Sequence, residues 1–271
     1  MTAGDADQRT ALFSLDQKGI FEKEIDQAVL DGQVDFAVHS MKDVPIFDKD
    51  SRLLIASVPE RGPVADVLVS KGNSLLKDME VGRRIGTSSL LRVAQLKRAR
   101  PDVKPEPIRG NVDTRIQKVE RGEFDAVVLA EAGLVRLGIA ERISERLAIE
   151  DFMPAPGQGA LAVVARKDDL KVIEMLKSIE HPPTRAEIEA ERELVRILEG
   201  GCKVPVGALA RTHGNRIQIA ASIFSMDGKV KLLAERSGHV LDAIVLAREM
   251  GEELLEKGAK GIEETWRTVY V

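Results

Sequence analysis

Residues 153–160 read MPAPGQGA, and this stretch interrupts the pattern that organises the rest of the chain. On both sides of it, short runs rich in β-branched residues alternate with amphipathic helical stretches, a pattern typical of α/β proteins. Two prolines and two glycines within these few residues allow neither a helix nor a central strand to continue. We therefore interpret 153–160 as a crossing between domains.

Ahead of the crossing, the sequence predicts an ordered series of strands and helices. Residues 20–30 are expected to form a helix that closes at Asp31–Gly32, and VDFAVHSM at 34–41 a buried strand that runs into the polar turn KDVP. Residues 66–70 are predicted as another short strand. Three strand–turn–helix units follow, with a Ser or Thr expected to cap the first helix and Asn111 the second. They are IGTSSLLRVAQLKRARP (85–101), VKPEPIRGNVDTRIQKVERGEF (103–124) and DAVVLAEAGLVRLG (125–138).

Beyond the crossing, the pattern resumes and then changes once more. ALAVVARKD (160–168) is predicted as a strand, 171–180 as a helix and His181-Pro182-Pro183 as a linker. Thr184 is expected to cap a charged helix that runs to about residue 198. The turn EGGCKVP (199–205), strands between 206 and 235 with a hairpin turn at 226–229, and a last helix at 241–255 complete the chain.

These elements predict an α/β protein of three domains. Residues 1–60 form the first part of domain 1, 61–153 form an inserted domain 2, and 154–180 return to domain 1. Residues 181–271 form a small C-terminal α+β domain that carries the cysteine of EGGCKVP.

Composition excludes several classes of function. The net charge is −4 and aromatic residues make up 3% of the chain, so it lacks the basic surface and the stacking side chains of a nucleic-acid-binding protein. No apolar run approaches the roughly 18 residues that a membrane span requires, and MTAGDADQRT does not resemble a secretory signal. A single cysteine cannot form an intrachain disulfide. We expect a cytoplasmic monomer without nucleic-acid or membrane partners.

Polar side chains gather at the strand-to-helix turns, where an open α/β sheet binds its ligand. Lys42 and Asp43 follow the strand at 34–41. In GTSSLLR, Ser89 and its two hydroxyl-bearing neighbours lie at a helix N-terminus, which binds anions. Arg92 lies one turn inside that helix, where the helix dipole disfavours a cation. A bound anion would remove this objection.

Arginines recur at the next turns. Arg109 and Arg115 lie in RGNVDTR, and Arg136 lies in AGLVRLG. A guanidinium binds a carboxylate through two hydrogen bonds and stays charged, so the set predicts a ligand rich in carboxylates. Each arginine alone could equally be an ordinary surface or ion-pair residue, and Asp43 a turn-forming residue. Repetition at successive turns favours a binding site.

Cys202, in EGGCKVP, is the one cysteine of the sequence. A free cysteine is most often a buried, inert thiol, but the preceding glycines and Lys203 indicate an exposed and electropositive turn. The thiol is then a candidate nucleophile or attachment point. The histidines are scattered and form neither a Cys–His pair nor a known metal-ligand spacing, so we predict no metal.

Six stretches, in order and spacing, resemble the porphobilinogen deaminase family, also called the hydroxymethylbilane synthases: HSMKDVP, GTSSLLR, RGNVDTR, AGLVRLG, PAPGQGA and EGGCKVP. The resemblance covers essentially the whole chain. It implies a transferase of tetrapyrrole biosynthesis that joins four porphobilinogen molecules head to tail with release of ammonia. It also implies a dipyrromethane cofactor attached by a thioether to Cys202, and first and second domains that resemble the lobes of periplasmic binding proteins closing over a cleft.

By the same resemblance, Asp43 is the catalytic aspartate, which faces the pyrrole N–H groups of cofactor and substrate and stabilises the cation formed as ammonia leaves. The other family positions reach the acetate and propionate groups of the pyrroles or lie beside them. Cofactor contacts are implied for Cys202, Lys42, Ser89, Arg92 and Arg109, and substrate contacts for Arg115, Arg136, Gln158, Lys18 and Phe21. Lys18 and Phe21 belong to KGIF, which matches a mobile loop of the family.

Two departures from the family pattern affect this expectation. The resemblance implies a strand–helix–strand unit ahead of MTAGD, of about 30 residues or more, and without it the first domain is expected to expose a sheet edge. The family usually has paired arginines where this chain has Leu91 and Arg92. The alternatives are a catalytically impaired homologue, a two-lobed polycarboxylate-binding protein, and a hydrolase with Cys202 as nucleophile.

Overall fold

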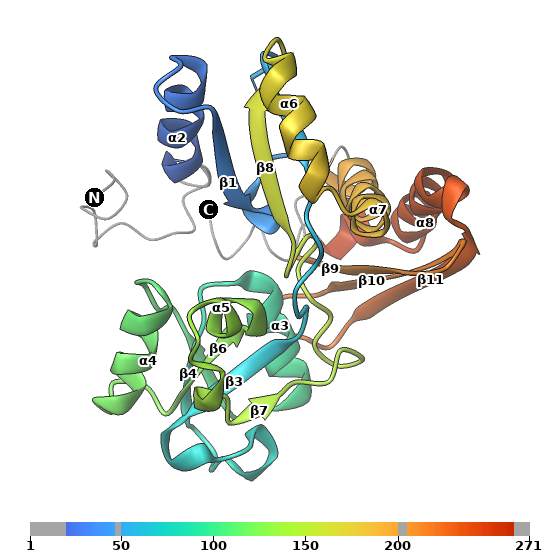
Figure 1. Cartoon of the computed structure of the whole chain (residues 1–271). Coiled ribbons are helices and arrows are strands. Elements are labelled where there is room, and N and C mark those ends of the chain that lie inside the picture. The colour runs from blue at the N-terminus through green and yellow to red at the C-terminus, as the bar shows by residue number, and fades with distance from the viewer. Residues whose placement is uncertain (1–19, 47–49, 200–204, 263–271) are drawn as a thin grey trace.

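Three β-sheets, each with its own helices, organise the chain. The computed structural model describes residues 20–46, 50–199 and 205–262, and these ranges form a mixed α/β fold (Figure 1). We call the first three-stranded sheet with its helices lobe 1, the five-stranded sheet with its helices lobe 2, and the last three-stranded sheet with its helices the third domain. In Figure 1, lobe 1 lies above lobe 2, and the third domain lies on the right.

Lobe 1 is built from two segments far apart in the sequence. β1 (Phe36–Ser40) and β2 (Leu53–Ser57) both pair antiparallel with β8 (Leu161–Arg166), which lies between them. The helix α2 (Ile20–Leu30) contributes Val29 to the core on one face of this sheet. α6 (Leu170–Leu176) contributes Leu176 to the core on the other face. Lobe 1 is therefore complete only after the chain has returned from lobe 2.

The sequence prediction that β1 is a buried strand is wrong for one of its faces. Ala37 and His39 point into the core, whereas Phe36 and Val38 are 45% and 51% exposed. The cause is that α2 packs on one face of β1, while no element among the described residues covers Phe36 and Val38. Asp26 of α2 holds His39 on the buried face, with 2.9 Å between Oδ1 and the imidazole Nε2. In the described part of lobe 1, β1 is an edge strand with an apolar outer face.

Lobe 2 brings the carboxyl ends of its parallel strands together at one end of the sheet. Its sheet has the order β5 (Lys104–Glu106), β4 (Arg84–Gly86), β6 (Ala126–Ala130), β3 (Asp66–Ser70) and β7 (Glu145–Arg146). β4 is parallel to both β5 and β6, and β3 is antiparallel to β6, with Asp66 opposite Ala130. Consequently the first residue of β3 lies beside the carboxyl ends of the parallel strands. The helices α3 (Leu90–Ala99), α4 (Val112–Glu120) and α5 (Glu131–Arg136) follow those ends.

The third domain is an antiparallel sheet packed against two helices. β9 (Val206–His213), β10 (Arg216–Phe224) and β11 (Lys231–His239) pair in sequence order, and α7 (Pro182–Glu199) and α8 (Ala243–Glu256) pack against them (Figure 1). The hairpin turn predicted at 226–229 lies between β10 and β11 as expected. Leu91 and Ala94 of α3 join the core of this domain, so lobe 2 and the third domain share apolar contacts.

Residues 181–183 do not form the linker that the sequence predicted. α7 already begins at Pro182, and Thr184 lies in its first turn rather than at its cap. A proline fits the first turn of a helix because its missing N–H would have no intrahelical partner there. His181 takes the capping role, since the Thr184 N–H donates to its Nδ1 at 3.3 Å and the Arg185 N–H to its carbonyl oxygen at 3.0 Å. Short 3-10 helices connect other elements: Met41–Asp43, Lys71–Asn73, Leu76–Asp78, Ala140–Arg142, Lys177–Ile179 and Val240–Asp242.

A buried ion pair fastens the third domain to the two segments that connect the lobes. Arg61 lies on the first connection, between β2 and β3, and Glu191 lies on α7; their side chains are 3% and 0% exposed. Arg61 NH1 donates to Glu191 Oε1 at 2.7 Å, and Arg61 Nε donates to the Gln158 carbonyl oxygen on the second connection at 3.0 Å. The same carboxylate accepts from the backbone N–H groups of Gly157 at 2.6 Å and Ala210 at 2.8 Å.

The two glycines of the crossing allow this close approach. Gly157 and Gly159 have φ values of +77° and +85°, a region that L side chains rarely adopt. A Cβ on Gly159 would lie 2.6 Å from the Pro63 carbonyl oxygen, and one on Gly157 would lie 3.0 Å from the Lys42 nitrogen. Gly-Gln-Gly therefore packs directly against the first connection and against the turn after β1, with Gln158 between them.

Candidate active site at the junction of the lobes

Gln158 connects the two lobes through its side chain. The residue is 1% exposed, and its Nε2 donates to the Val64 carbonyl oxygen at 2.8 Å and to Asp66 Oδ1 at 2.7 Å. Its Oε1 accepts from Lys42 Nζ of lobe 1 at 3.3 Å and from Arg92 NH2 of lobe 2 at 3.4 Å. One buried amide thus links the turn after β1 to the edge of the lobe 2 sheet.

Asp66 and Arg92 form a buried pair with two hydrogen bonds beside this amide. Arg92 NH2 donates to Asp66 Oδ1 at 2.6 Å and Nε donates to Oδ2 at 3.0 Å. Arg92 NH1 donates to the Val128 carbonyl oxygen of β6 at 3.1 Å. From the sequence, the Arg92 cation near the N-terminus of α3 was expected to interact unfavourably with the helix dipole unless an anion lay beside it. In the structure, that anion belongs to the protein itself. That anion is Asp66, which sequence reasoning did not single out.

The turn before α3 is held by its own hydroxyl groups. Ser89 is the N-cap of the helix, and its Oγ accepts from the Arg92 backbone N–H at 3.4 Å. Thr87 Oγ1 accepts from the Ser89 N–H at 3.2 Å. Ser88 Oγ donates to the Ile108 carbonyl oxygen at 2.7 Å and so joins this turn to the turn before α4, whose helix is capped by Asn111 as the sequence predicted.

Lys42 and Asp43 lie on the lobe 1 side of the junction, in the 3-10 turn after β1. Lys42 is accessible to solvent, yet burial among the surrounding protein atoms lowers the pKa of its ammonium, and the positive charges of Arg92 and Arg115 lower it further. Asp43 and Asp66 oppose this shift. The Asp43 carboxylate is exposed. An accessible ammonium among other cations is a position where a carboxylate ligand is favourable.

Three further arginines were predicted for the site from the sequence, and two of them have contacts that tie them to the junction. Arg115, in the first turn of α4, donates from Nε to the Gly110 carbonyl oxygen at 2.8 Å, and burial lowers the pKa of its guanidinium, with a further contribution from Arg92. Arg136, at the end of α5, donates from NH2 to the Gly159 carbonyl oxygen at 2.6 Å, and burial lowers its pKa also. Arg109 is half-buried in the turn between β5 and α4.

The junction therefore brings together most of the site residues predicted from the sequence. Lys42, Asp43, Arg92, Arg115 and Gln158 are coupled by hydrogen bonds or by charge, and Arg136 contacts the crossing beside Gln158. Cys202 and Lys18 lie outside the described residues, and so does the side chain of Phe21, whose backbone belongs to α2. α7, which ends at Glu199, leads toward Cys202 in the sequence.

Sequence reasoning missed three residues of the junction: Asp66, Arg61 and Glu191. A signal for Asp66 exists, because a carboxylate at the start of a strand whose residues are otherwise apolar needs a buried partner. No comparable signal marks Arg61 or Glu191, since Glu191 lies among other charges in a helix with several acidic residues. Their pairing depends on the contact between α7 and the first connection, which the sequence does not specify.

The described side chains of the site suit the binding of anions. In the described ranges, no group of three or more His, Cys, Asp or Glu side chains is arranged to hold a metal ion. The accessible donors are an ammonium and guanidinium groups, which suit carboxylates. Lys42 Nζ and Arg92 NH2 both donate to the same Gln158 oxygen, at 3.3 and 3.4 Å, so a ligand with several carboxylates fits this donor set.

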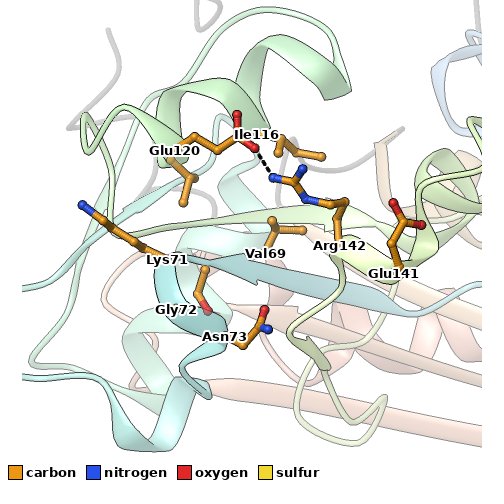
Figure 2. A pocket seen from close by; sticks show the side chains of 10 residues that line it. Val69, Lys71, Gly72, Asn73, Ile116, Glu120, Glu141 and Arg142 are labelled. Carbon is orange, nitrogen blue, oxygen red and sulfur yellow. Dashed lines mark hydrogen bonds and ion pairs between the residues drawn. The ribbon is translucent and has the colours of Figure 1, made fainter.

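A hollow lies at the opposite end of the lobe 2 sheet and is separate from this site. It is lined by residues that include Val69, Lys71, Asn73 and Ile116, and an ion pair between Arg142 and Glu120 lies along it (Figure 2). β3 begins at Asp66 in the junction and ends at Ser70 in this hollow. The junction and this hollow are therefore separated by the length of β3.

The fold and the site define a two-lobed α/β protein with a third domain, whose junction carries cations that suit a small molecule rich in carboxylates. Residues 1–174 match the family domain described as "Porphobilinogen deaminase, dipyromethane cofactor binding domain", and residues 185–257 match "Porphobilinogen deaminase, C-terminal domain". The chain belongs to the porphobilinogen deaminase family. This confirms the resemblance inferred from the six sequence motifs.

Curated relatives match over nearly the whole chain. The "Probable porphobilinogen deaminase" of Nitrosopumilus maritimus is 50% identical over 266 residues, which cover 98% of this chain and 85% of that protein. The porphobilinogen deaminase of Desulforudis audaxviator is 46% identical and covers 95% of this chain and 83% of that protein. Among solved structures, the aliphatic sulphonate binding protein SsuA from Escherichia coli is 15% identical with a TM-score of 0.37, covering 65% of this chain and 58% of that one.

No helix in the described ranges is long and apolar enough to cross a membrane.

Proposed function

We propose that this chain is a hydroxymethylbilane synthase that uses the junction of the lobes as its active site. The enzyme condenses four porphobilinogen molecules head to tail and releases ammonia at each step. The observation that supports this assignment is that Lys42 of lobe 1 and Arg92 of lobe 2 both donate to Gln158 Oε1, at 3.3 and 3.4 Å, while Arg136 donates to the Gly159 carbonyl oxygen beside it at 2.6 Å. Each porphobilinogen unit carries two carboxylates, so a growing pyrrole chain matches this set.

Each side chain has a distinct task in this proposal. The ammonium of Lys42 and the guanidinium groups of Arg109, Arg115 and Arg136 bind acetate and propionate groups, because charge-assisted hydrogen bonds to carboxylates are stronger than neutral ones. The hydroxyl of Ser89 holds the helix start beside them. The exposed carboxylate of Asp43 stabilises positive charge on the substrate as ammonia leaves. Cys202 would hold a dipyrromethane, with Arg92 and Gln158 among the residues on its binding side, and this group would supply the pyrrole to which the first substrate is joined.

The remaining parts of the proposal concern organisation and location. Domain 1 comprises 1–60 and the return segment 154–180, domain 2 comprises 61–153, and the cofactor-attachment domain comprises 181–271. Lys18 and Phe21 of the KGIF motif contact the substrate. The enzyme acts as a monomer in the cytoplasm, without nucleic-acid or membrane partners.

Covalent attachment of pyrroles distinguishes this function from its alternatives. Intact-mass spectrometry of the purified chain should show a mass increase of two pyrrole units, and Ehrlich's reagent in acid should give a coloured adduct. Cys202→Ser should abolish both. A polycarboxylate-binding protein or a Cys202 hydrolase would show neither, even after incubation with porphobilinogen, and that result would refute the proposal.

Turnover separates an active enzyme from an impaired homologue. Asp43→Ala should keep the attached pyrroles, because Asp43 makes no hydrogen bond to the described residues that hold the fold, while turnover of porphobilinogen falls by about a hundredfold or more. Near-wild-type turnover in Asp43→Ala would show that this carboxylate has another role. A wild-type chain that carries pyrroles but forms no hydroxymethylbilane would be an impaired homologue.

A further inference from the structure

Among residues 20–46, 50–199 and 205–262, Asp66 is the carboxylate that contacts both Arg92 and Gln158 at the junction. The residue is 1% exposed, and three donors reach its two oxygens: Arg92 through two nitrogens at 2.6 and 3.0 Å, and Gln158 Nε2 at 2.7 Å. It is the first residue of β3, immediately after the connection that enters lobe 2. Its position is fixed by the β3–β6 ladder, in which it lies opposite Ala130.

The contact with Gln158 extends to lobe 1. Because Nε2 of Gln158 donates to Asp66 and to Val64, the amide has one orientation, with Oε1 turned toward Lys42 and Arg92. A rotation of the amide by 180° would place its NH₂ group against an ammonium and a guanidinium, which donate and cannot accept. Asp66 therefore determines which atom of Gln158 faces Lys42.

The charge of Asp66 matters in addition to its geometry. The groups that act on the Lys42 ammonium, besides burial, are Arg92 on α3 and Arg115 on α4, which lower its pKa, and Asp43 beside it and Asp66 on β3, which raise it. Removal of either carboxylate charge leaves the ammonium among cations. Lys42 would then lose its proton at a lower pH.

We propose that Asp66 is a positioning residue of this enzyme, which orients the Arg92 guanidinium directly and the Lys42 ammonium through Gln158 so that both are aligned for the carboxylates of the pyrroles. The inference rests on the function proposed above and adds to it a residue that does not itself touch the substrate. It also assigns a reason for the buried amide of Gln158, which orients a cation rather than binding substrate through its own oxygen.

The test compares Asp66→Asn with Asp125→Asn in the same expressed, full-length chain. Asn at 66 keeps the shape but places an NH₂ donor against Arg92 or Gln158, so the network cannot form. Asp125 is a matched control, because it also pairs with an arginine of lobe 2, Arg83, at 2.9 Å and accepts from a backbone N–H, that of Arg84, at 2.7 Å. It lies just before β6, at the opposite end of that strand from Ala130.

The measurements are the fraction of protein that carries pyrroles by intact mass, and kcat and KM for porphobilinogen across a range of pH. For Asp66→Asn we expect the KM to rise about tenfold while kcat changes less than about threefold, because binding that is equal in ground and transition state appears in KM. The basic limb of kcat/KM should move to lower pH, and pyrrole attachment from added porphobilinogen should be slower. Asp125→Asn should match wild type in all of these.

Several results would overturn the inference. A KM within about threefold of wild type, or a basic limb that does not move, would show that Asp66 only supports the fold. If Asp66→Asn does not accumulate as folded protein, Gln158→Met replaces it, because this variant keeps the direct Asp66–Arg92 pair and removes the amide that links it to Lys42, together with the hydrogen bond to Val64. Lys42 then loses the oxygen that accepts from its ammonium. The same shift of the basic limb is expected, and its absence overturns the proposal. A wild-type chain without attached pyrroles or activity would instead refute the proposed function, and this inference with it.

Discussion

Removal of the Glu191 carboxylate should strongly destabilise the contact between the third domain and the two connections of the lobes. Glu191→Ala leaves Arg61 buried at 3% exposure with its main partner gone, and it leaves the N–H groups of Gly157 and Ala210 without their acceptor. Loss of one partner of a buried ion pair costs about 3–5 kcal/mol. Glu187 remains 3.4 Å from Arg61 NH1, so we expect about 3 kcal/mol, at the lower end of this range.

Urea unfolding followed by circular dichroism measures this loss, and thermal unfolding should show a midpoint lower by about 6–12 °C. Glu193→Ala, on the same helix, is the control, because Glu193 pairs with Arg196 and Arg248, which are 46% and 49% exposed, and such pairs contribute about 0–1 kcal/mol. The double variant Arg61→Met with Glu191→Met should be more stable than Glu191→Ala, because no buried charge is left unpaired. A loss below about 1 kcal/mol for Glu191→Ala, or a double variant as unstable as the single one, would refute this reasoning.

Three further changes have defined outcomes. Gly159→Ala should lower the free energy of unfolding by more than about 2 kcal/mol, because its Cβ would meet backbone oxygens at 2.6 and 2.7 Å. The control is Gly214→Ala, where φ is +62° and the space around the Cβ is open. Its free energy of unfolding, measured by the same chemical denaturation, should fall by only about 1 kcal/mol. Asp227 accepts from the Ser225 hydroxyl and from the Lys229 N–H, which hold its pKa below the ordinary value. Its contribution is present above the unfolded pKa of about 4 and is lost as pH falls through the folded value, so the difference in stability between wild type and Asp227→Asn should be constant above about pH 5 and should shrink as the pH falls below about 4. Val38 is 51% exposed on an edge strand, so Val38→Lys should change the free energy of unfolding by less than about 0.5 kcal/mol and should reduce any self-association measured by sedimentation. Val163 is buried and pairs with Val38 on the neighbouring strand. Val163→Lys should therefore prevent folding.

Local patterns in the sequence predicted the local elements well. The helix at 20–30 and the strand at 66–70 have the predicted bounds, and Ser89 and Asn111 cap their helices as expected. These features depend on periodicity and on short-range hydrogen bonds, which adjacent residues determine. The start of α7 was misplaced because a proline can end one segment or begin a helix, and the sequence alone does not distinguish the two.

Features that depend on contacts between distant segments could not be predicted in the same way. The exposure of Phe36 depends on which elements pack on β1, and an apolar alternation does not reveal that one face lacks a cover. Arg92 was predicted to face a ligand, but its partner within the structure is Asp66, which lies 26 residues away in the sequence. A charge near a helix N-terminus indicates that an anion is close, but it does not tell whether the anion belongs to a ligand or to the protein.

The return of β8 to lobe 1 has a consequence for synthesis on the ribosome. Val38 pairs with Val163, while every strand of the lobe 2 sheet has emerged once residue 146 has been made. Contacts between distant residues form late because the intervening chain must first be ordered. Lobe 2 should therefore fold before β8, the central strand of the lobe 1 sheet, can pair with β1 and β2. During that interval the apolar residues of β1 and β2 are exposed, which makes the nascent lobe 1 the part of this protein that most depends on chaperones.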